Sequence, residues 1–330
     1  RTTRNIGLDL EIMDGKLEFT AEYYSNTSDD VLIDLPIPLS NGSLAGLTTN
    51  AGSIQNSGVE FSATWRPRIG DVVFNISPNF YTLRNEVLDI GTLDFLSGTG
   101  ARTEVGRAVG EHYGWVYDGI FQTQGEVESH AFQNDNTAPG DIRFVDLNED
   151  GIINDADRQY LGQGMPTYYY GLNIVANYKN FDFTIFGQGS GGNLINSNLY
   201  RGLMVTSGYT NWHEDILNRW TPSNTNTDVP RVVLNDPNNN QRDSDRPGWL
   251  QDGSYFRLNT ISLGYSFGQS VLERVKMQSA RLYVTMQNVH VFSAYEGYNP
   301  DFQAGILNPG FDFGTFPRPT TTMVGLQIKF

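Results

Sequence analysis

The chain has 330 residues, a formal net charge of −15 and no cysteine. The acidic balance argues against a nucleic-acid ligand, because neutralising phosphates requires clustered Lys and Arg. The lack of cysteine excludes disulfides, thiolate zinc sites and cysteine nucleophiles, and no apolar run reaches the roughly 18 residues of a membrane-spanning helix.

Nine segments alternate in polarity with the two-residue period of a β-strand. In each segment one set of alternate side chains is largely apolar, and the other set is mostly polar or small. The segments span residues 5–12, 16–24, 58–66, 72–81, 167–178, 181–188, 255–267, 281–292 and 320–330. Helical patterns are limited to residues 214–220 and 271–277. The pattern predicts an all-β, antiparallel fold.

The segment at 167–178 shows the alternation most clearly. One face carries a row of apolar residues with aromatics near its ends: Tyr168, Tyr170, Leu172, Ile174, Ala176 and Tyr178. An apolar face with aromatic ends is what a strand facing lipid requires. The last strand alternates in the same way, so we expect Val324, Leu326 and Ile328 to face lipid and Gln327 and Lys329 to face the lumen of a barrel.

The connections between these segments alternate in length. They are short around residues 14, 67–71 and 179–180 and modest around 269–279, whereas 83–166 and 189–253 are long insertions. Membrane barrels have short periplasmic turns and longer extracellular loops. The sequence therefore predicts an antiparallel transmembrane β-barrel with long extracellular loops and with Phe330 on the periplasmic side. Because bacterial barrels have an even strand count, nine strands lead us to expect further strands before Arg1.

An acidic loop precedes the clearest strand and resembles an EF-hand calcium loop. Asp146, Asn148 and Asp150 occupy the first, third and fifth positions, and Gly151 supplies the bend. The Ile152 carbonyl would be the seventh ligand, and Asp157 stands where a bidentate Glu is usual. The pattern favours one structural calcium ion. The alternative is a solvated acidic turn.

Other motifs give no catalytic or nucleotide-binding site, and we expect the protein not to be an enzyme. Residues 187–192 match G-x-G-x-x-G, but no βαβ unit surrounds them, so a flexible loop entry is the better interpretation. The four histidines lack ligand spacing. Trp212, Trp220 and Trp249 lie among polar residues of the second long insertion. They are candidates for contacts with a substrate or partner, and packing between loops is an equal alternative.

Several segments resemble the SusC/RagA-like TonB-dependent outer-membrane transporters. The similar segments are residues 50–60, 140–157 with the following strand, 220–231, 253–265, 281–288 and the terminal Phe330. They follow one another in the family's order and cover essentially the whole chain.

The resemblance implies nine C-terminal strands of a 22-stranded, plugged barrel in the cell outer membrane, where it is a multi-pass protein. In the family, the plug and a TonB box lie in the N-terminal part, and neither is recognisable here. The implied function is TonB-dependent import of glycans or peptides, with a SusD-like surface lipoprotein as a lid and the TonB complex as the driver. The alternative is a soluble, calcium-dependent, carbohydrate-binding β-sandwich.

Overall fold

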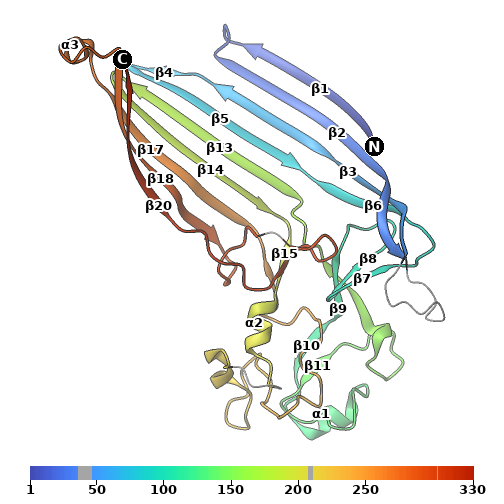
Figure 1. Cartoon of the computed structure of the whole chain (residues 1–330). Coiled ribbons are helices and arrows are strands. Elements are labelled where there is room, and N and C mark those ends of the chain that lie inside the picture. The colour runs from blue at the N-terminus through green and yellow to red at the C-terminus, as the bar shows by residue number, and fades with distance from the viewer. Residues whose placement is uncertain (36–46, 207–210, 303) are drawn as a thin grey trace.

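The computed structural model describes residues 1–35, 47–206, 211–302 and 304–330. Nine long strands form one antiparallel sheet, in which each pairs with its neighbours along the chain (Figure 1). They are β1 (Thr2–Ile12), β2 (Leu17–Leu35), β3 (Leu47–Trp65), β5 (Val72–Thr82), β13 (Tyr168–Tyr178), β14 (Phe181–Gly191), β17 (Tyr255–Ser266), β18 (Ser279–Ser293) and β20 (Thr321–Lys329). Each overlaps one of the nine segments expected from the sequence. The sheet is a single curved layer, which confirms the barrel-type interpretation over the sandwich.

The structure corrects several boundaries. β2 and β3 continue well beyond the expected strands at 16–24 and 58–66, because a polar stretch can pair as a strand without showing apolar alternation. The expected flexible entry at 187–192 is instead largely the end of β14, paired with β13 and β17. The helical pattern at 214–220 is the short 3-10 helix η3 (Glu214–Asn218), and that at 271–277 is α3 (Gln269–Arg274).

The two faces of the sheet differ in chemistry. Residues directly opposite in an antiparallel pair share a face, so the register of the strands defines rows that cross the sheet. One face, the apolar face, carries rows such as Ile76, Ile174, Ile185, Ile261 and Met286, and Phe74, Ala176, Phe183, Leu263, Val284 and Val324. The other face, the polar face, carries rows such as Ser62, Asn79, Gly171 and Gln188.

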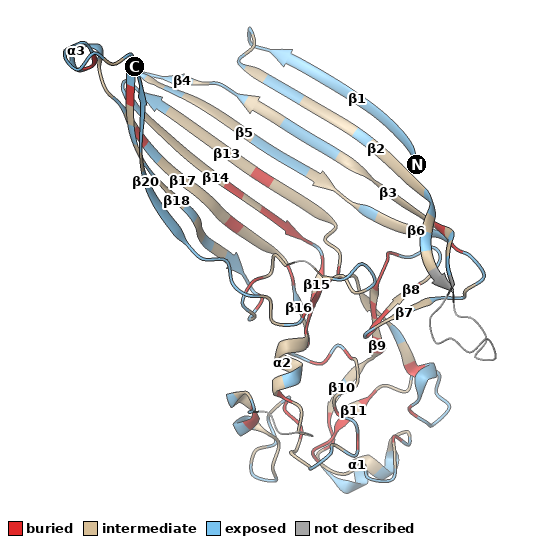
Figure 2. Ribbon diagram, in the orientation of Figure 1, coloured by how far each residue is buried: buried red, intermediate tan, exposed pale blue. Residues whose placement is uncertain are grey.

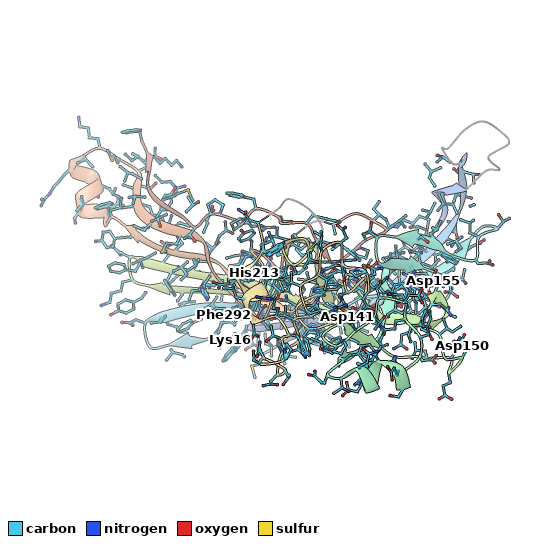
Figure 3. All side chains as sticks on the ribbon, turned by 90° about the horizontal axis from the view of Figure 1, so that it is seen from below. Lys16, Asp141, Asp150, Asp155, His213 and Phe292 are labelled. Atoms are coloured by element: carbon cyan, nitrogen blue, oxygen red, sulfur yellow. The ribbon has the colours of Figure 1, made fainter. Side chains whose placement is uncertain are left out.

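Connections of similar length gather at the same end of the sheet. At one end are the short turns, and at the other are the first insertion (residues 83–167), the second insertion (192–254) and the third loop (294–320) (Figure 1). These three segments are called the loop body. Seen from the loop end, the sheet rises on both sides of this body (Figure 3). The arrangement confirms the alternation of long and short connections.

The loop body contains short elements of its own. Small sheets and bridges organise it. Two further short strands extend the main sheet: β6, at the start of the first insertion, pairs with β3, and β4, in the short connection before β5, pairs with β5. Besides β4 (Arg68–Ile69), which lies outside the loop body, the short elements are β6 (Arg84–Ile90), β7 (Leu96–Gly98), β8 (Ala101–Thr103), β9 (Glu111–Trp115), β10 (Tyr117–Ile120), α1 (Gln124–Ser129), β11 (Ile142–Phe144), η2 (Asp155–Asp157), β12 (Arg158–Gly162), β15 (Leu194–Ser197), α2 (Asn198–Leu203), β16 (Leu250–Asp252) and β19 (Phe311–Asp312).

Buried side chains concentrate in the loop body and near the loop ends of the strands (Figure 2). Three apolar clusters lie there, centred on Val87, on Phe144 and on Ile216. Most of the main sheet is half-buried or exposed on both faces. Within the part of the chain that the structure describes, no helix is long and apolar enough to cross a membrane.

Candidate functional site

The apolar face is banded by aromatic rings at two levels. Near the loop end, Tyr170 stacks on Phe256 with ring centroids 6.1 Å apart, and Phe256 stacks on Phe292 at 6.2 Å. Near the turn end, Phe181 packs against Tyr265 at 4.9 Å. Tyr170 and Tyr178 differ by eight positions, or about 27 Å of strand. A tilt of about 40° reduces this to roughly 21 Å, close to the height of a membrane barrel's apolar band.

Between the aromatic levels the face is mostly aliphatic, with the rings of Phe74 and Phe183 in one of its rows. Much of it is exposed: Leu263 is 51% and Val324 72% exposed. A continuous apolar surface of this extent is rare on a monomer in water and marks a surface that something apolar covers. The face therefore has the chemistry of a lipid-contacting surface.

Three glycines of β14 make room for the aromatic rings near the loop end. A Cβ at Gly187 would lie 2.4 Å from the Phe256 ring, one at Gly189 2.7 Å from the Tyr170 ring, and one at Gly191 2.4 Å from the Tyr168 hydroxyl. Rings lying over strand glycines shield the backbone and fix the register. The glycine pattern at 187–192 thus reflects packing under aromatics.

The polar face carries ion pairs and hydroxyl contacts. Arg66 Nη1 lies 2.7 Å from Glu18 Oε1, and Arg281 Nε donates to Asp182 Oδ1 at 2.9 Å. The Ser262 and Thr285 hydroxyls are 2.8 Å apart on the same face. Carboxylates, guanidinium groups and hydroxyls suit a water-filled interior.

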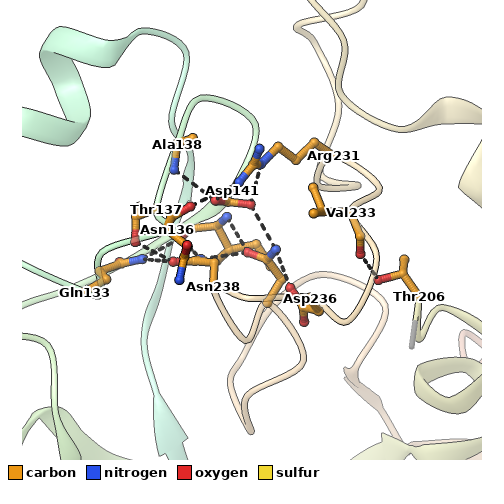
Figure 4. Close-up of polar contacts among 12 residues, drawn as sticks. Gln133, Asn136, Thr137, Ala138, Asp141, Thr206, Arg231, Val233, Asp236 and Asn238 are labelled. Carbon is orange, nitrogen blue, oxygen red and sulfur yellow. Dashed lines mark hydrogen bonds and ion pairs between the residues drawn. The ribbon is translucent and has the colours of Figure 1, made fainter. Parts of the chain in front are cut away.

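A buried polar network joins the first and second insertions (Figure 4). Arg231 donates from Nε and Nη2 to the two carboxylate oxygens of Asp141, both at 2.8 Å, and Asp141 is 1% exposed. Asn240 accepts from the Ile142 amide at 2.8 Å and donates to Asp141 Oδ1 at 3.1 Å. The buried Asn238 Oδ1 accepts from the Thr137 hydroxyl at 2.7 Å. The two insertions therefore form one packed unit.

Sequence reasoning did not find this network. Arg231 and Asp141 are 90 positions apart, and no local period or motif links them. Both residues do lie in segments that resemble the transporter family, residues 140–157 and 220–231.

The three tryptophans of the second insertion have different environments. Trp249 is 1% exposed, and its ring lies 4.9 Å from the Arg246 guanidinium carbon. Trp220 donates from Nε1 to Gln122 Oε1 at 2.9 Å, which bridges the insertions. Trp212 is 47% exposed. Packing between loops accounts for Trp249 and Trp220, and Trp212 alone presents substantial ring surface.

Arg246 is the most deeply buried cation of the loop body. It is 1% exposed, and its Nε and Nη1 have no hydrogen-bond partner. Burial lowers the pKa of its guanidinium to about 10, because desolvation penalises the charged form. At neutral pH the group therefore stays charged, and the ring of Trp249 supplies a cation–π contact.

The acidic loop folds around its own backbone amides at the edge of the loop body, away from His213 (Figure 3). Asp146 Oδ2 accepts from the Gly151 amide at 2.8 Å, and Asp150 Oδ1 from the Ile152 amide at 2.9 Å. The fully buried Asp157 accepts from two backbone amides and joins the two ends of the loop.

The loop brings several oxygen atoms together that could serve as ligands of a cation. Asp146 Oδ1 is buried without a hydrogen-bond partner, and Asn148 and Asp150 lie close together, joined by a side-chain hydrogen bond of 3.0 Å. Among the described residues no three His, Cys, Asp or Glu side chains form a metal-type cluster. A calcium set here would therefore depend on the Asn148 amide and the Ile152 carbonyl as well as on carboxylates.

Comparisons with known proteins agree with the fold. No protein-family model matches the chain. It is 33% identical to TonB-dependent receptor P3 of Formosa agariphila, over 99% of this chain and 34% of that protein. It is 26% identical to TonB-dependent receptor SusC of Bacteroides thetaiotaomicron, over 100% of this chain and 32% of that protein.

The fold recurs in solved structures of the RagAB peptide transporter. The TM-score is 0.79 at 22% sequence identity, over 99% of this chain and 35% of the matched chain. These relatives are named receptors or transporters. The chain spans about a third of the length of the curated relatives it matches. The chain is therefore a homologue of the SusC-type TonB-dependent receptors, with the antiparallel barrel fold of RagAB over that third.

Proposed function

We propose that this chain is part of a receptor that imports oligosaccharides or peptides across the outer membrane by TonB-dependent transport. The observation that carries the proposal is the sheet itself, which has an exposed apolar face between two aromatic levels and a polar face opposite. In this proposal the nine strands form one arc of a plugged barrel of about 22 strands. The apolar face contacts lipid, and the polar face lines the lumen.

The test is uptake by cells that carry the receptor as it exists. Labelled oligosaccharide and peptide mixtures should accumulate when TonB is present and stop accumulating when TonB is deleted. Deleting the receptor gene should abolish the same uptake. Accumulation that continues without TonB would refute energised import, and accumulation that continues without the receptor would refute its role.

We place the loop body on the extracellular side, where it contacts a SusD-like lipoprotein. Exposed apolar side chains of the second insertion support a contact with the lipoprotein, since Leu217 is 77% and Leu234 78% exposed. Large exposed apolar surface marks sites that a partner protein covers. Trp212 is a further candidate for this contact or for substrate.

Replacing both Leu217 and Leu234 by Lys should reduce co-purification of the lipoprotein while the receptor still assembles. Both side chains are largely exposed, so the folded loop body loses little packing. The matched control replaces Leu272, which is 5% exposed at the opposite end of the sheet; it should perturb α3 and leave the partner bound. Undiminished co-purification of the double variant would exclude this surface. Deleting 223–240 is a poorer test, because it removes the Arg231, Asn238 and Asn240 contacts to the first insertion.

We propose one calcium ion held by Asp146, Asn148, Asp150, the Ile152 carbonyl and Asp157. Bound calcium would neutralise the carboxylates and stiffen the loop. Calcium should raise the melting temperature of the purified receptor relative to chelator. The stabilisation reaches about 2.7 kcal/mol when free calcium is about 100-fold above its Kd. Asp146→Ala should remove the difference, whereas Asp135→Ala, outside the motif, should preserve it. Equal melting temperatures with calcium and with chelator would leave the solvated acidic turn as the correct interpretation.

A further inference from the structure

Four tyrosines form a row on the polar face at its loop end. Tyr24 of β2, Tyr81 of β5, Tyr169 of β13 and Tyr255 of β17 share this face by register. Tyr81 and Tyr169 are directly paired and stacked, with centroids 4.6 Å apart and planes at 11°. Aromatic rings clustered on a face that is otherwise amide- and hydroxyl-rich are not needed for contact with lipid, because that contact belongs to the opposite face.

Tyr81, Tyr169 and Tyr255 of this row line a cavity of about 350 Å³. Its walls combine three of the tyrosine rings with two amides and one carboxylate: Asn79, Tyr81, Tyr169, Gln188, Tyr255 and Asp301. This volume lies within the range of small-ligand sites, which join apolar walls to a few placed polar groups.

The carboxylate wall of the cavity is held in place by the third loop. Asp301 Oδ2 lies 3.5 Å from Arg257 Nη2 and 3.1 Å from Arg318 Nη2. Arg257 is 2% exposed, and its Nη2 also donates to Asn299 Oδ1 at 2.6 Å. A buried arginine of the sheet thus anchors the loop beside the tyrosines, so the cavity is a preformed feature of the fold.

We propose that this cavity, the tyrosine platform, is a subsite for a neutral pyranose unit of an oligosaccharide. The proposal rests on the function proposed above and selects glycan as the substrate class. The apolar C–H face of a pyranose can lie on an aromatic ring, which offers a large rigid surface. The amides of Asn79 and Gln188 each donate and accept, and Asp301 accepts, so together they match vicinal hydroxyl groups.

Two other ligand classes fit less well. A peptide that binds by strand addition needs a free strand edge, but β5, β13, β14 and β17 are each paired on both sides at this site. An anionic glycan would have to approach a chain of net charge −15, which opposes its entry. A neutral, hydroxyl-rich ring can hydrogen-bond to the amides and the carboxylate of the cavity without bringing in a charge of its own.

The test measures glycan binding to the purified full-length receptor in detergent. A microarray of plant, algal and animal glycans and a peptide array identify the ligand, and calorimetry gives its Kd. Tyr169→Ala should raise the glycan Kd about tenfold, equivalent to about 1.4 kcal/mol, and Tyr169→Phe should stay near wild type because it keeps the ring. Tyr168→Ala is the matched control, since it removes the neighbouring tyrosine from the apolar face.

Gln188→Ala provides a second readout that does not alter the ring stack, and it too should weaken glycan binding. Three results would overturn the platform: binding to peptides instead of glycans, binding to no glycan, or a glycan Kd unchanged by both Tyr169→Ala and Gln188→Ala. Failure of the import proposal is seen separately, as uptake that does not require TonB. Each proposal can therefore fail while the other stands.

Discussion

Replacing Asp141 by alanine is expected to destabilise the loop body by about 1.5–3 kcal/mol. The reason is that Arg231, whose side chain is 25% exposed, would lose both oxygens of its buried partner, which removes two charge-assisted hydrogen bonds. Asn240 would lose its acceptor on the same carboxylate. Hydrogen exchange in detergent should show faster exchange around residues 133–145 and 231–242, because the network joins these segments.

The control for this prediction is an exposed ion pair in the same insertion. Arg143 Nε lies 2.7 Å from Asp118 Oδ2, and the Asp118 side chain is 50% exposed. Asp118→Ala should therefore cost less than about 1 kcal/mol. Pairing Asp141→Ala with Arg231→Met removes both charges and should recover part of the loss. Similar small effects of Asp141→Ala and Asp118→Ala would show that the buried network does not hold the insertions together.

Placing an arginine at Ile261 should impair assembly in the outer membrane, at a cost of about 2–4 kcal/mol. Ile261 lies opposite Ile185 and Met286 on the apolar face, in the row of Ile174, midway between the aromatic levels at Tyr170 and Tyr178. Leu326 shares its row with Tyr265 and Leu282, nearer the turn-end aromatics, where a charge costs less. An arginine at Ile261 should therefore impair assembly more than an arginine at Leu326, so Ile261 is the more sensitive position for this test.

The neighbouring residue supplies the control. Ser262 faces the opposite way and contacts Thr285, so Ser262→Arg should cost little if this face meets water. Heat-modifiable migration of the receptor in gels would report the assembled fraction. Equal assembly of the two arginine variants would contradict the proposed orientation of the sheet.

The main sheet could be predicted from the sequence because its signal is local. A period of two fixes which side chains share a face, and the apolar rows then align across neighbouring strands. Val324, Leu326 and Ile328 share one face and Gln327 and Lys329 the other, as expected. The signal ends where the apolar band ends, so the polar halves of β2 and β3 were missed.

The loop body could not be predicted in the same way, since its contacts join distant segments. The Thr99 amide donates to Asn308 Oδ1 across 209 positions, and the pair of Asp141 and Arg231 spans 90. Residue type alone does not show where a tryptophan lies, because one tryptophan of a loop can be exposed and another buried. Trp249 is buried against Arg246 whereas Trp212 is half-exposed, and only the fold distinguishes them.

The central claim is that one face of the sheet contacts lipid and the other water. The chain has no cysteine, so single cysteines can be introduced along β17 at residues 260–265 and spin-labelled in outer-membrane vesicles. Labels at residues 261, 263 and 265 should collide more with oxygen, which concentrates in lipid, and labels at 260, 262 and 264 more with a water-soluble nickel chelate. Collision rates that fail to alternate, or that alternate in the opposite sense, would contradict the account.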